Sequence, residues 1–452
     1  MIFSLIKRLI SVITAFVLAL LPGTATPERR TEPVFTGTFL QSWLGVQWDD
    51  EQWQKEIDVM KRDGIEHLII QSVAEKTMES AGGEWTVYYD IDLPEFDDAA
   101  RGDNIVEAAL KACKGTGIKV YIGLSLFDDF WYQGGFTSQY DECCRIAASL
   151  VKDIYTRYGE EYKDTLCGFY FTPEFSNIIW ETTSASKLAD GVNVIIDEMN
   201  VVCPELPLVM SPFYTNYVSL GTFDALTFWT RLVDRIKFRD GDIIAPQDAV
   251  GAAFTQIDEL EKNWKLYRSV IDNADADIKL WANCESFKLA REKTIISGIG
   301  LPPATENTLS VPVTMDRFAY QLDIASRYCD NIITFSYNHY LSPNQVDSRF
   351  IEAYRKYVES GYSVEKNAPE APTGFSATDS DEGVVLTWNG SADDMGIAYY
   401  RITKNGKFLT RVECMYGDPV LSFTDADGEL SDIYSINAYD TSGNVSASAV
   451  AK

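Results

Sequence analysis

Two glutamates, Glu174 and Glu285, each follow a short apolar run of the kind that forms a buried strand. Such residues could cleave a glycosidic bond, a reaction that needs one carboxyl group on either side of the bond. One carboxyl group protonates the leaving oxygen, and the other attacks the anomeric carbon or activates water. We predict that Glu174 and Glu285 form this pair. Two alternatives stay open: Glu174 works with another acid, Asp248 or Asp128, or either glutamate is only a structural ion-pair partner.

Polar and aromatic side chains also follow the other candidate strands. Sugars present apolar C–H faces, which aromatic rings can cover, and hydroxyl groups, which amides and carboxylates can bond. Any one of these aromatic residues could serve only for packing, and a structural role for the histidine stays open. The predicted substrate-binding residues are Gln41, Trp43, Gln71, Asp128, Trp131, Tyr214, Asp248, Asn283, Tyr337 and His339.

Between residues 35 and 362, eight strand-like runs alternate with helical patterns. Mostly apolar runs of this length are typical of parallel strands that are buried on both faces. Eight strand–helix units predict an α/β fold, the (βα)8 or TIM barrel, whose active site lies at the carboxyl ends of the strands. A doubly wound open sheet is the alternative, although no GxGxxG follows the first run. The runs are Thr38–Trp43, His67–Ser72, Lys119–Leu124, Leu166–Phe171, Leu208–Ser211, Asp242–Ala245, Lys279–Asn283 and Asn331–Ser336.

The pattern changes after Tyr362. Residues 363–373 contain Pro369 and Pro372 and are typical of a linker. Residues 374–452 contain short alternating stretches that turn residues separate, which predicts a small all-β sandwich.

Motifs in this last segment resemble the fibronectin type III domain. They are Pro372–Phe375, Val384–Trp388, Tyr434–Asp440 and Gly443–Ser446. The resemblance implies an immunoglobulin-like sandwich with Trp388 in its core and Tyr434 on a late strand. It implies no catalytic role.

The barrel segment resembles a family of bacterial exported proteins described as glycoside-hydrolase-like. The motifs Gly37–Gln41, Gly168–Phe175 and Trp281–Phe287 carry this likeness. The glutamate positions also resemble a clan of retaining glycoside hydrolases, in which the acid/base follows strand four and the nucleophile follows strand seven. That clan has asparagine before the first glutamate, where this chain has Pro173. Since that asparagine bonds the sugar 2-hydroxyl, its absence weakens the transfer of the mechanism.

The first 25 residues have the pattern of a secretory signal peptide. Lys7 and Arg8 precede the apolar run Leu9–Leu21, and Pro22–Ala25 supplies a turn and small residues. We therefore expect cleavage before Thr26, a secreted or cell-surface location, and no stable membrane insertion afterwards. An uncleaved membrane anchor is the alternative.

Composition limits the partners. The net charge of −28 disfavours nucleic acid and anionic membranes. With two histidines and no CxxC pair, neither a metal nor another cofactor is expected, and the eight cysteines are expected to be mostly buried free thiols. The chain also has no GxSxG elbow and no P-loop.

These observations together predict an exported glycoside hydrolase that acts on a poly- or oligosaccharide. Two other functions stay open. The same aromatic and polar residues would suit a barrel that binds carbohydrate without cleaving it. The appended sandwich would suit a surface adhesion or scaffold protein.

Overall fold

The structure, a computed structural model, describes residues 27–128, 139–176, 182–213, 222–289, 294–296, 310–417 and 421–451. The chain forms two compact units. The first contains the chain up to Glu285 together with Gln321–Phe335, and the second contains Ser286–Tyr320 together with Ser336–Lys452.

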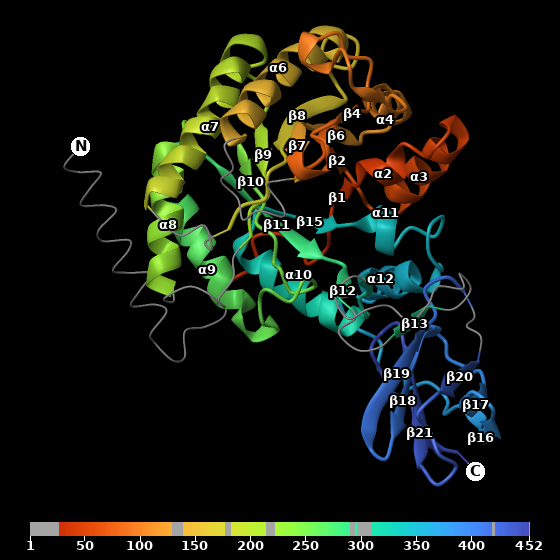
Figure 1. The fold of residues 1–452 in the computed structure, drawn as a ribbon. Helices are drawn as coiled ribbons and strands as arrows, with labels where there is room; N and C mark the ends of the chain where they lie inside the picture. Colours follow the sequence, from red (N-terminus) through yellow and green to blue (C-terminus); the bar gives the residue numbers. More distant parts are fainter. Residues whose placement is uncertain are drawn as a thin grey trace. The chain divides into compact units, whose positions relative to one another are not determined.

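The first unit is built on a closed barrel of eight parallel strands, as the sequence predicts (Figure 1). All eight runs form strands, whose ends differ from the predicted ones by at most three residues. In barrel order the strands are β1 (Gly37–Leu40), β15 (Asn331–Phe335), β11 (Lys279–Glu285), β10 (Ile243–Ile244), β9 (Leu208–Met210), β8 (Leu166–Phe171), β6 (Lys119–Gly123) and β2 (His67–Ile70).

Helices follow the strands and bury one face each. In α3 (Asp50–Arg62) the carboxylate of Asp49 accepts the Gln52 N–H at 2.8 Å and caps the first turn, while Trp53, Ile57 and Met60 form the buried stripe. The other helices after the strands are α4 (Ile105–Cys113), α6 (Tyr140–Tyr158), α7 (Thr182–Val202), α8 (Thr222–Arg235), α9 (Leu260–Ile271), α10 (Met315–Tyr328) and α12 (Arg349–Glu359).

Side chains from every strand fill the barrel interior. This core joins Phe39, Ile69, Tyr121, Tyr170, Val209, Ile243, Ala245, Trp281 and Ile333. The rings of Phe39 and Tyr170 meet edge to face, with their centroids 5.0 Å apart. Gly123 allows β2 and β6 to approach, because a Cβ atom there would lie 2.1 Å from the Gln71 carbonyl oxygen. The barrel is therefore a packed core and not a pore.

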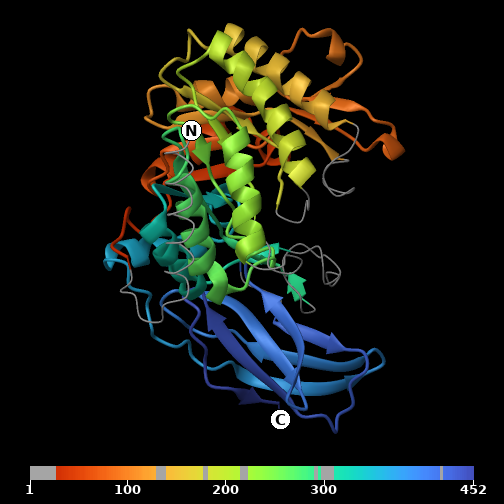
Figure 2. The ribbon, with the colours of Figure 1, turned by 90° about the vertical axis from the view of Figure 1, so that its left-hand side faces the viewer.

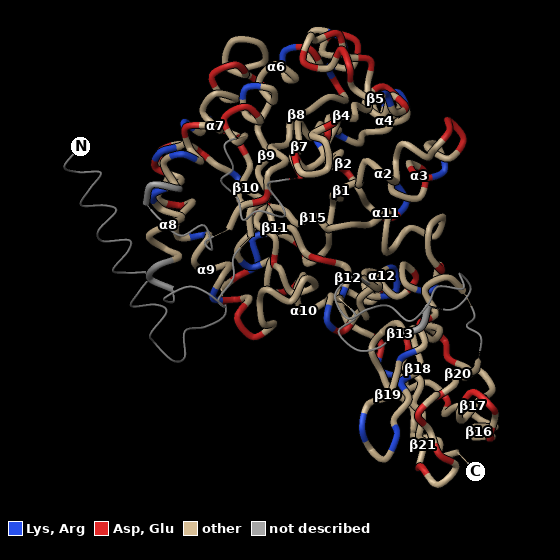
Figure 3. Tube along the Cα trace, viewed as in Figure 1, with Lys and Arg blue, Asp and Glu red and all other residues tan. Residues whose placement is uncertain are grey.

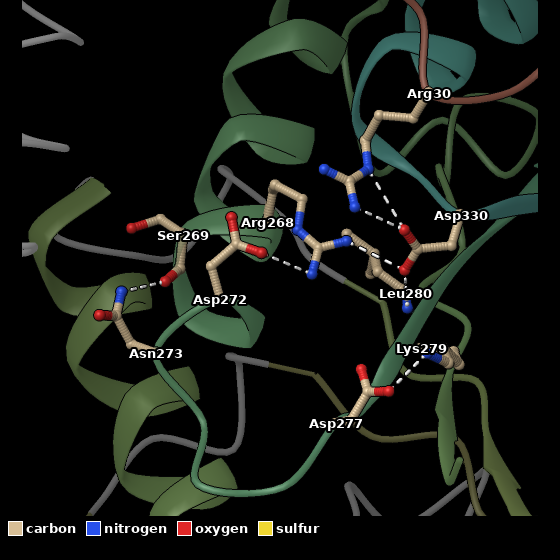
Figure 4. A network of polar contacts seen from close by, with 9 residues as sticks. All are labelled: Arg30, Arg268, Ser269, Asp272, Asn273, Asp277, Lys279, Leu280 and Asp330. Carbon is tan, nitrogen blue, oxygen red and sulfur yellow. Dashed lines mark hydrogen bonds and ion pairs between the residues drawn. The ribbon is translucent and has the colours of Figure 1, made fainter. Parts of the chain in front are cut away.

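An ion-pair network surrounds Asp330, which directly precedes β15. Its carboxylate accepts bonds from Arg30 at 2.8 Å, from Arg268 at 3.0 Å and from the Leu280 N–H at 3.0 Å (Figure 4). Burial opposes ionisation of Asp330, but these donors outweigh it and hold its pKa below the usual range. The network therefore links the starts of β11 and β15 at the amino-terminal end of the barrel.

A four-stranded sheet accompanies the barrel and was not predicted from the sequence. Its order is β5 (Ala100–Arg101), β4 (Trp85–Val87), β3 (Ala74–Lys76) and β7 (Ser125–Phe127). The strands have two or three residues each, which is too short to show a clear alternation in sequence.

The second unit contains two sheets with a common core (Figure 2). One sheet has the order β16 (Thr373–Ser380), β17 (Gly383–Asn389) and β20 (Ser422–Asp425). The other has the order β13 (Thr294–Ile296), β19 (Lys407–Glu413), β18 (Ile397–Lys404), β21 (Tyr434–Asp440) and β22 (Ala449–Val450). Trp388 and Tyr434 both lie in the core. The fibronectin type III assignment stays a prediction.

The edge strand β13 comes from a distant part of the sequence. Its residues Thr294, Ile295 and Ile296 pair in parallel with Arg411, Val412 and Glu413 of β19. A two-stranded antiparallel sheet of β12 (Phe287–Leu289) and β14 (Ser310–Pro312) belongs to the same unit. The unit therefore begins well before the predicted linker at residues 363–373.

All eight cysteines are free, and all except the partly exposed Cys167 are buried. The chain is acidic, with 67 Asp and Glu against 39 Lys and Arg, and Figure 3 shows the acidic positions spread along it. Within the described residues, no helix has the length and hydropathy needed to span a membrane.

Candidate active site

The interior of the barrel changes from apolar to polar at the carboxyl ends of the strands. Side chains alternate along a strand, so Asn283 and Glu285 share the interior face of β11 with Trp281. The same alternation continues past the core residues of β1, β2, β9 and β10. We call the resulting set the polar layer: Gln41, Gln71, Ser211, Gln247, Asn283 and Glu285.

Isolated β-bridges between single residues extend the barrel sheet on one side of the polar layer. Phe213 pairs with Ser176 on one flank and with Gln247 on the other, and Gln247 pairs with Asn283, all in parallel. These pairs continue β8, β9 and β10 beyond their regular ends, beside β11. They order the segment after β8 that carries Glu174.

Glu174 contacts the polar layer through Gln247. Its carboxyl group is partly exposed but closely surrounded by protein, and this burial raises its pKa to about 7, although a hydrogen bond with the Gln247 side chain acts in the opposite direction. Burial, and then the nearby Glu174 charge, hold the pKa of the Tyr170 hydroxyl well above its usual value. A carboxyl group that titrates near neutral pH can donate a proton in catalysis.

Glu285, the last residue of β11, is buried. Its carboxylate accepts the Ala252 N–H at 2.8 Å, and its carbonyl oxygen accepts the Gln321 amide at 3.1 Å. Ala249 and Ala253, on either side of Ala252, adopt left-handed φ angles of 55° and 60°. The loop after β10 therefore accepts backbone strain while it holds an N–H group on this carboxylate. Such a bond favours the ionised form.

Asp248 supports the end of β11. Its Oδ1 atom accepts the N–H groups of Val250 at 3.2 Å and Glu285 at 3.3 Å, and its Oδ2 atom accepts the Gln321 amide at 2.5 Å. With donors on both oxygens, this buried carboxylate fixes the backbone beside Glu285. These bonds give Asp248 a framework role, and its predicted contact with substrate stays a prediction.

The remaining predicted residues have varied surroundings. Gln41 is buried, Gln71 is partly exposed, and Trp43 on α2 (Ser42–Gly45) is 49% exposed. Asp128 is partly exposed, and its charge contributes to the raised pKa of Tyr88, behind burial and the Glu75 charge. Trp131 and Tyr214 lie outside the described residues.

Tyr337 and His339 belong to the second unit, on α11 (Tyr337–Tyr340). Tyr337 is fully buried. The His339 ring stacks on Tyr340 with a centroid distance of 4.2 Å, and burial lowers its pKa to about 4. His339 is therefore neutral near physiological pH.

Sequence reasoning did not select Ser211, Gln247 or Tyr170. Sequence reasoning selected Asp248 and not its neighbour Gln247. The signal that identifies Gln247 is alternation, since it lies two residues after the core residue Ala245 and four after Ile243.

No group of three or more His, Cys, Asp or Glu residues suited to a metal ion occurs in the described part of the chain.

Comparison with known proteins identifies the family to which the barrel segment belongs. The profile of a family described as a domain of unknown function, DUF4434, matches residues 35–347. No curated protein matches the chain. A solved structure from Bacteroides thetaiotaomicron, described as a candidate alpha-L-fucosidase, is similar in fold, with a TM-score of 0.58 and 19% identity over 76% of this chain and 100% of that one.

Two further solved structures are more distant. A beta-glucuronidase from Bacteroides uniformis has a TM-score of 0.43 and 10% identity, over 94% of this chain and 48% of that one. A chitinase from Bacillus thuringiensis has a TM-score of 0.41 and 9% identity, over 91% of this chain and 83% of that one.

Proposed function

The chain belongs to the DUF4434 family, and from this premise we propose that its barrel is a glycoside hydrolase acting on a poly- or oligosaccharide. One observation carries the proposal: the carboxyl group of Glu174, with a pKa near 7, contacts a layer of neutral amides at the carboxyl ends of the barrel strands. The activity described for the fucosidase-like structure belongs to the same reaction class.

In the proposed reaction, Glu174 is the proton donor. Near pH 6 most Glu174 carboxyl groups carry the proton that the leaving oxygen needs. The bond between the anomeric carbon and that oxygen breaks as the proton moves to the oxygen. In a retaining reaction, Glu174 then accepts a proton from the attacking water in a second step. In an inverting reaction, where water attacks directly and Glu285 takes its proton, Glu174 regains a proton from solvent and Glu285 releases one.

Glu285 is the proposed partner carboxylate. The Ala252 N–H stabilises its ionised form, which either attacks the anomeric carbon or removes a proton from the attacking water. The anomeric configuration of the first product, followed by proton NMR, distinguishes retention from inversion.

The central experiment varies the leaving group. Glu174→Gln should lower the hydrolysis of an unactivated oligosaccharide by roughly 10²–10⁴-fold. It should have little effect on the first release of dinitrophenol from the matching dinitrophenyl glycoside, because that leaving group departs without a proton. Glu285→Gln should slow both substrates.

Equal loss on both substrates in Glu174→Gln would remove Glu174 from the donor role. Saturable sugar binding without hydrolysis by the wild-type protein would support the non-catalytic binding barrel instead.

We also propose that the protein is exported through its first 25 residues and that the second unit contains a fibronectin type III-like domain. The signal-peptide pattern supports the first proposal. Two sheets around the core that contains Trp388 and Tyr434 support the second.

A further inference from the structure

A buried oxygen in the polar layer lacks a hydrogen-bond partner. The side-chain amide of Asn283 donates through Nδ2 to the Ser211 hydroxyl at 3.2 Å. Its Oδ1 atom has no partner, and the residue is only 1% exposed. A buried acceptor without a hydrogen bond lowers the stability of the fold by about 1–3 kcal/mol, so its presence here calls for a functional explanation.

The position of Asn283 connects this oxygen with the proposed reaction. Asn283 pairs with Gln247, which is bonded to Glu174, and it lies two residues before Glu285 on the same strand face. The unpaired oxygen is therefore in the layer that carries the two carboxyl groups. Since protein shields it from bulk water, a hydroxyl group that enters the layer can supply its donor.

The layer also lacks positive charge. None of its six members is Lys or Arg, and it contains Glu285 and contacts Glu174. Among these described residues an anionic sugar would meet carboxylates and no compensating cation, which is costly in a desolvated site. A neutral sugar would bring hydroxyl donors at no such cost.

We propose that Asn283 Oδ1 accepts a hydrogen bond from a hydroxyl group of a neutral sugar, and that the polar layer selects neutral sugars against uronic acids. This inference rests on the proposed function, because it assigns the substrate class of the same site. It concerns binding, so it is testable apart from cleavage.

The first experiment compares sugars that differ only at C6. Binding of methyl glycosides and short oligosaccharides of glucose and galactose is measured by calorimetry on the full chain, beside their glucuronic and galacturonic acid counterparts. At least one neutral sugar should bind tenfold or more tightly than its uronic acid. Equal or tighter binding of the uronic acids, or no saturable binding in either series, would overturn the proposal.

The second experiment is a double cycle on the neutral sugar that binds best. Its hydroxyl groups are replaced one at a time by fluorine, which cannot donate a hydrogen bond. One replacement should weaken binding to the wild-type protein by tenfold or more. It should have no further effect on Asn283→Ala, because the acceptor is already absent.

Asn263→Ala is the matched control. Asn263 on α9 also has a buried Oδ1 atom without a partner, but it lies on a helix outside the strand ring. Its removal should leave the sugar discrimination unchanged. If Asn283→Ala fails to fold, Asn283→Leu, which has a similar shape and cannot accept a hydrogen bond, takes its place.

Additive effects in the cycle would mean that the sugar hydroxyl does not bond Asn283, and would overturn the inference. Hydrolysis is assayed separately with Glu174→Gln, so a protein that binds neutral sugars without cleaving them would contradict the proposed function and leave this inference standing.

Discussion

Glu174 and Gln247 are hydrogen-bonded although they follow β8 and β10, two strands with β9 between them. The bond places a neutral amide, not a cation, beside the proposed proton donor. An Arg or Lys at position 247 would hold the carboxyl group ionised. The amide leaves its pKa in the range where acid catalysis operates.

The first prediction concerns this bond and the pH profile. Activity should fall as pH rises through about 7, because Glu174 then loses its proton. Gln247→Met removes the donor that favours the ionised form of Glu174, so it should shift the fall in activity to higher pH. Gln247→Lys should move it to lower pH. Profiles of kcat/KM against pH would show both shifts. If activity falls at the same pH in both variants and in the wild type, Gln247 does not influence the pKa of Glu174.

The second prediction concerns stability. In the folded state Glu174 has a raised pKa, so between its unfolded value near 4.3 and about 7 the folded protein binds more protons than the unfolded one. The contribution of Glu174 to stability is therefore present below about pH 4.3 and is lost as pH rises through the folded pKa.

Compared with Glu174→Gln, the wild type should lose up to about 1.4 kcal/mol per pH unit across this window. Denaturant unfolding at several pH values measures the difference. A constant difference between wild type and Glu174→Gln would contradict the raised pKa.

The third prediction concerns the network at Asp330. Because its pKa is depressed in the folded state, its stabilising effect is present above about pH 4 and is lost at lower pH. Asp330→Asn should destabilise the protein by roughly 2–4 kcal/mol at pH 7, since it leaves Arg268 without this partner. The loss should shrink towards pH 3. Asp277→Asn, which removes only an exposed pair with Lys279, should cost well under 1 kcal/mol.

The fourth prediction concerns truncation. A chain that ends at residue 367 would leave β13 without β19, and the Met315 N–H without the Thr441 carbonyl that it bonds at 2.8 Å. We therefore expect the truncated protein to unfold less cooperatively or to aggregate, because a sheet edge and buried donors become exposed. Calorimetry of the two chains tests this. A sharp transition at the unchanged temperature would show that the rest of the chain folds without residues 368–452.

The fifth prediction concerns export. N-terminal sequencing of secreted protein should begin near Thr26, because small residues precede it. A mature chain that starts at Met1 in the cytosol would exclude a cleaved signal.

Periodicity in the sequence was enough to predict the barrel. Eight apolar runs gave eight strands, because parallel strands buried on both faces must be apolar along their length. The sequence did not predict β13, which has a partner more than 100 residues away. Pairing at such separation depends on the folded core and leaves no local pattern.

The candidate site could be predicted in part. Strand ends identified Glu174, Glu285 and Asn283, because position along a parallel strand fixes which end of the barrel a residue occupies. The sequence could not predict the hydrogen bonds that distinguish the acids at the strand ends from one another. Asp248 and Glu285 are both acids at strand ends, yet one is held by three backbone and amide donors and the other receives the Ala252 N–H.

The buried thiols have a consequence for handling the protein. Seven of the eight are covered by the fold, and burial raises the pKa of Cys113 and of Cys143 to about 12, so the native protein resists oxidation at these positions. Unfolding exposes all of them at once, including the adjacent Cys143 and Cys144. In an oxidising medium, each unfolded molecule can then form disulfides that the native fold has no place for. Heat inactivation without reductant should therefore follow the rate of first unfolding, and recovery on cooling should depend on whether a thiol reagent was present.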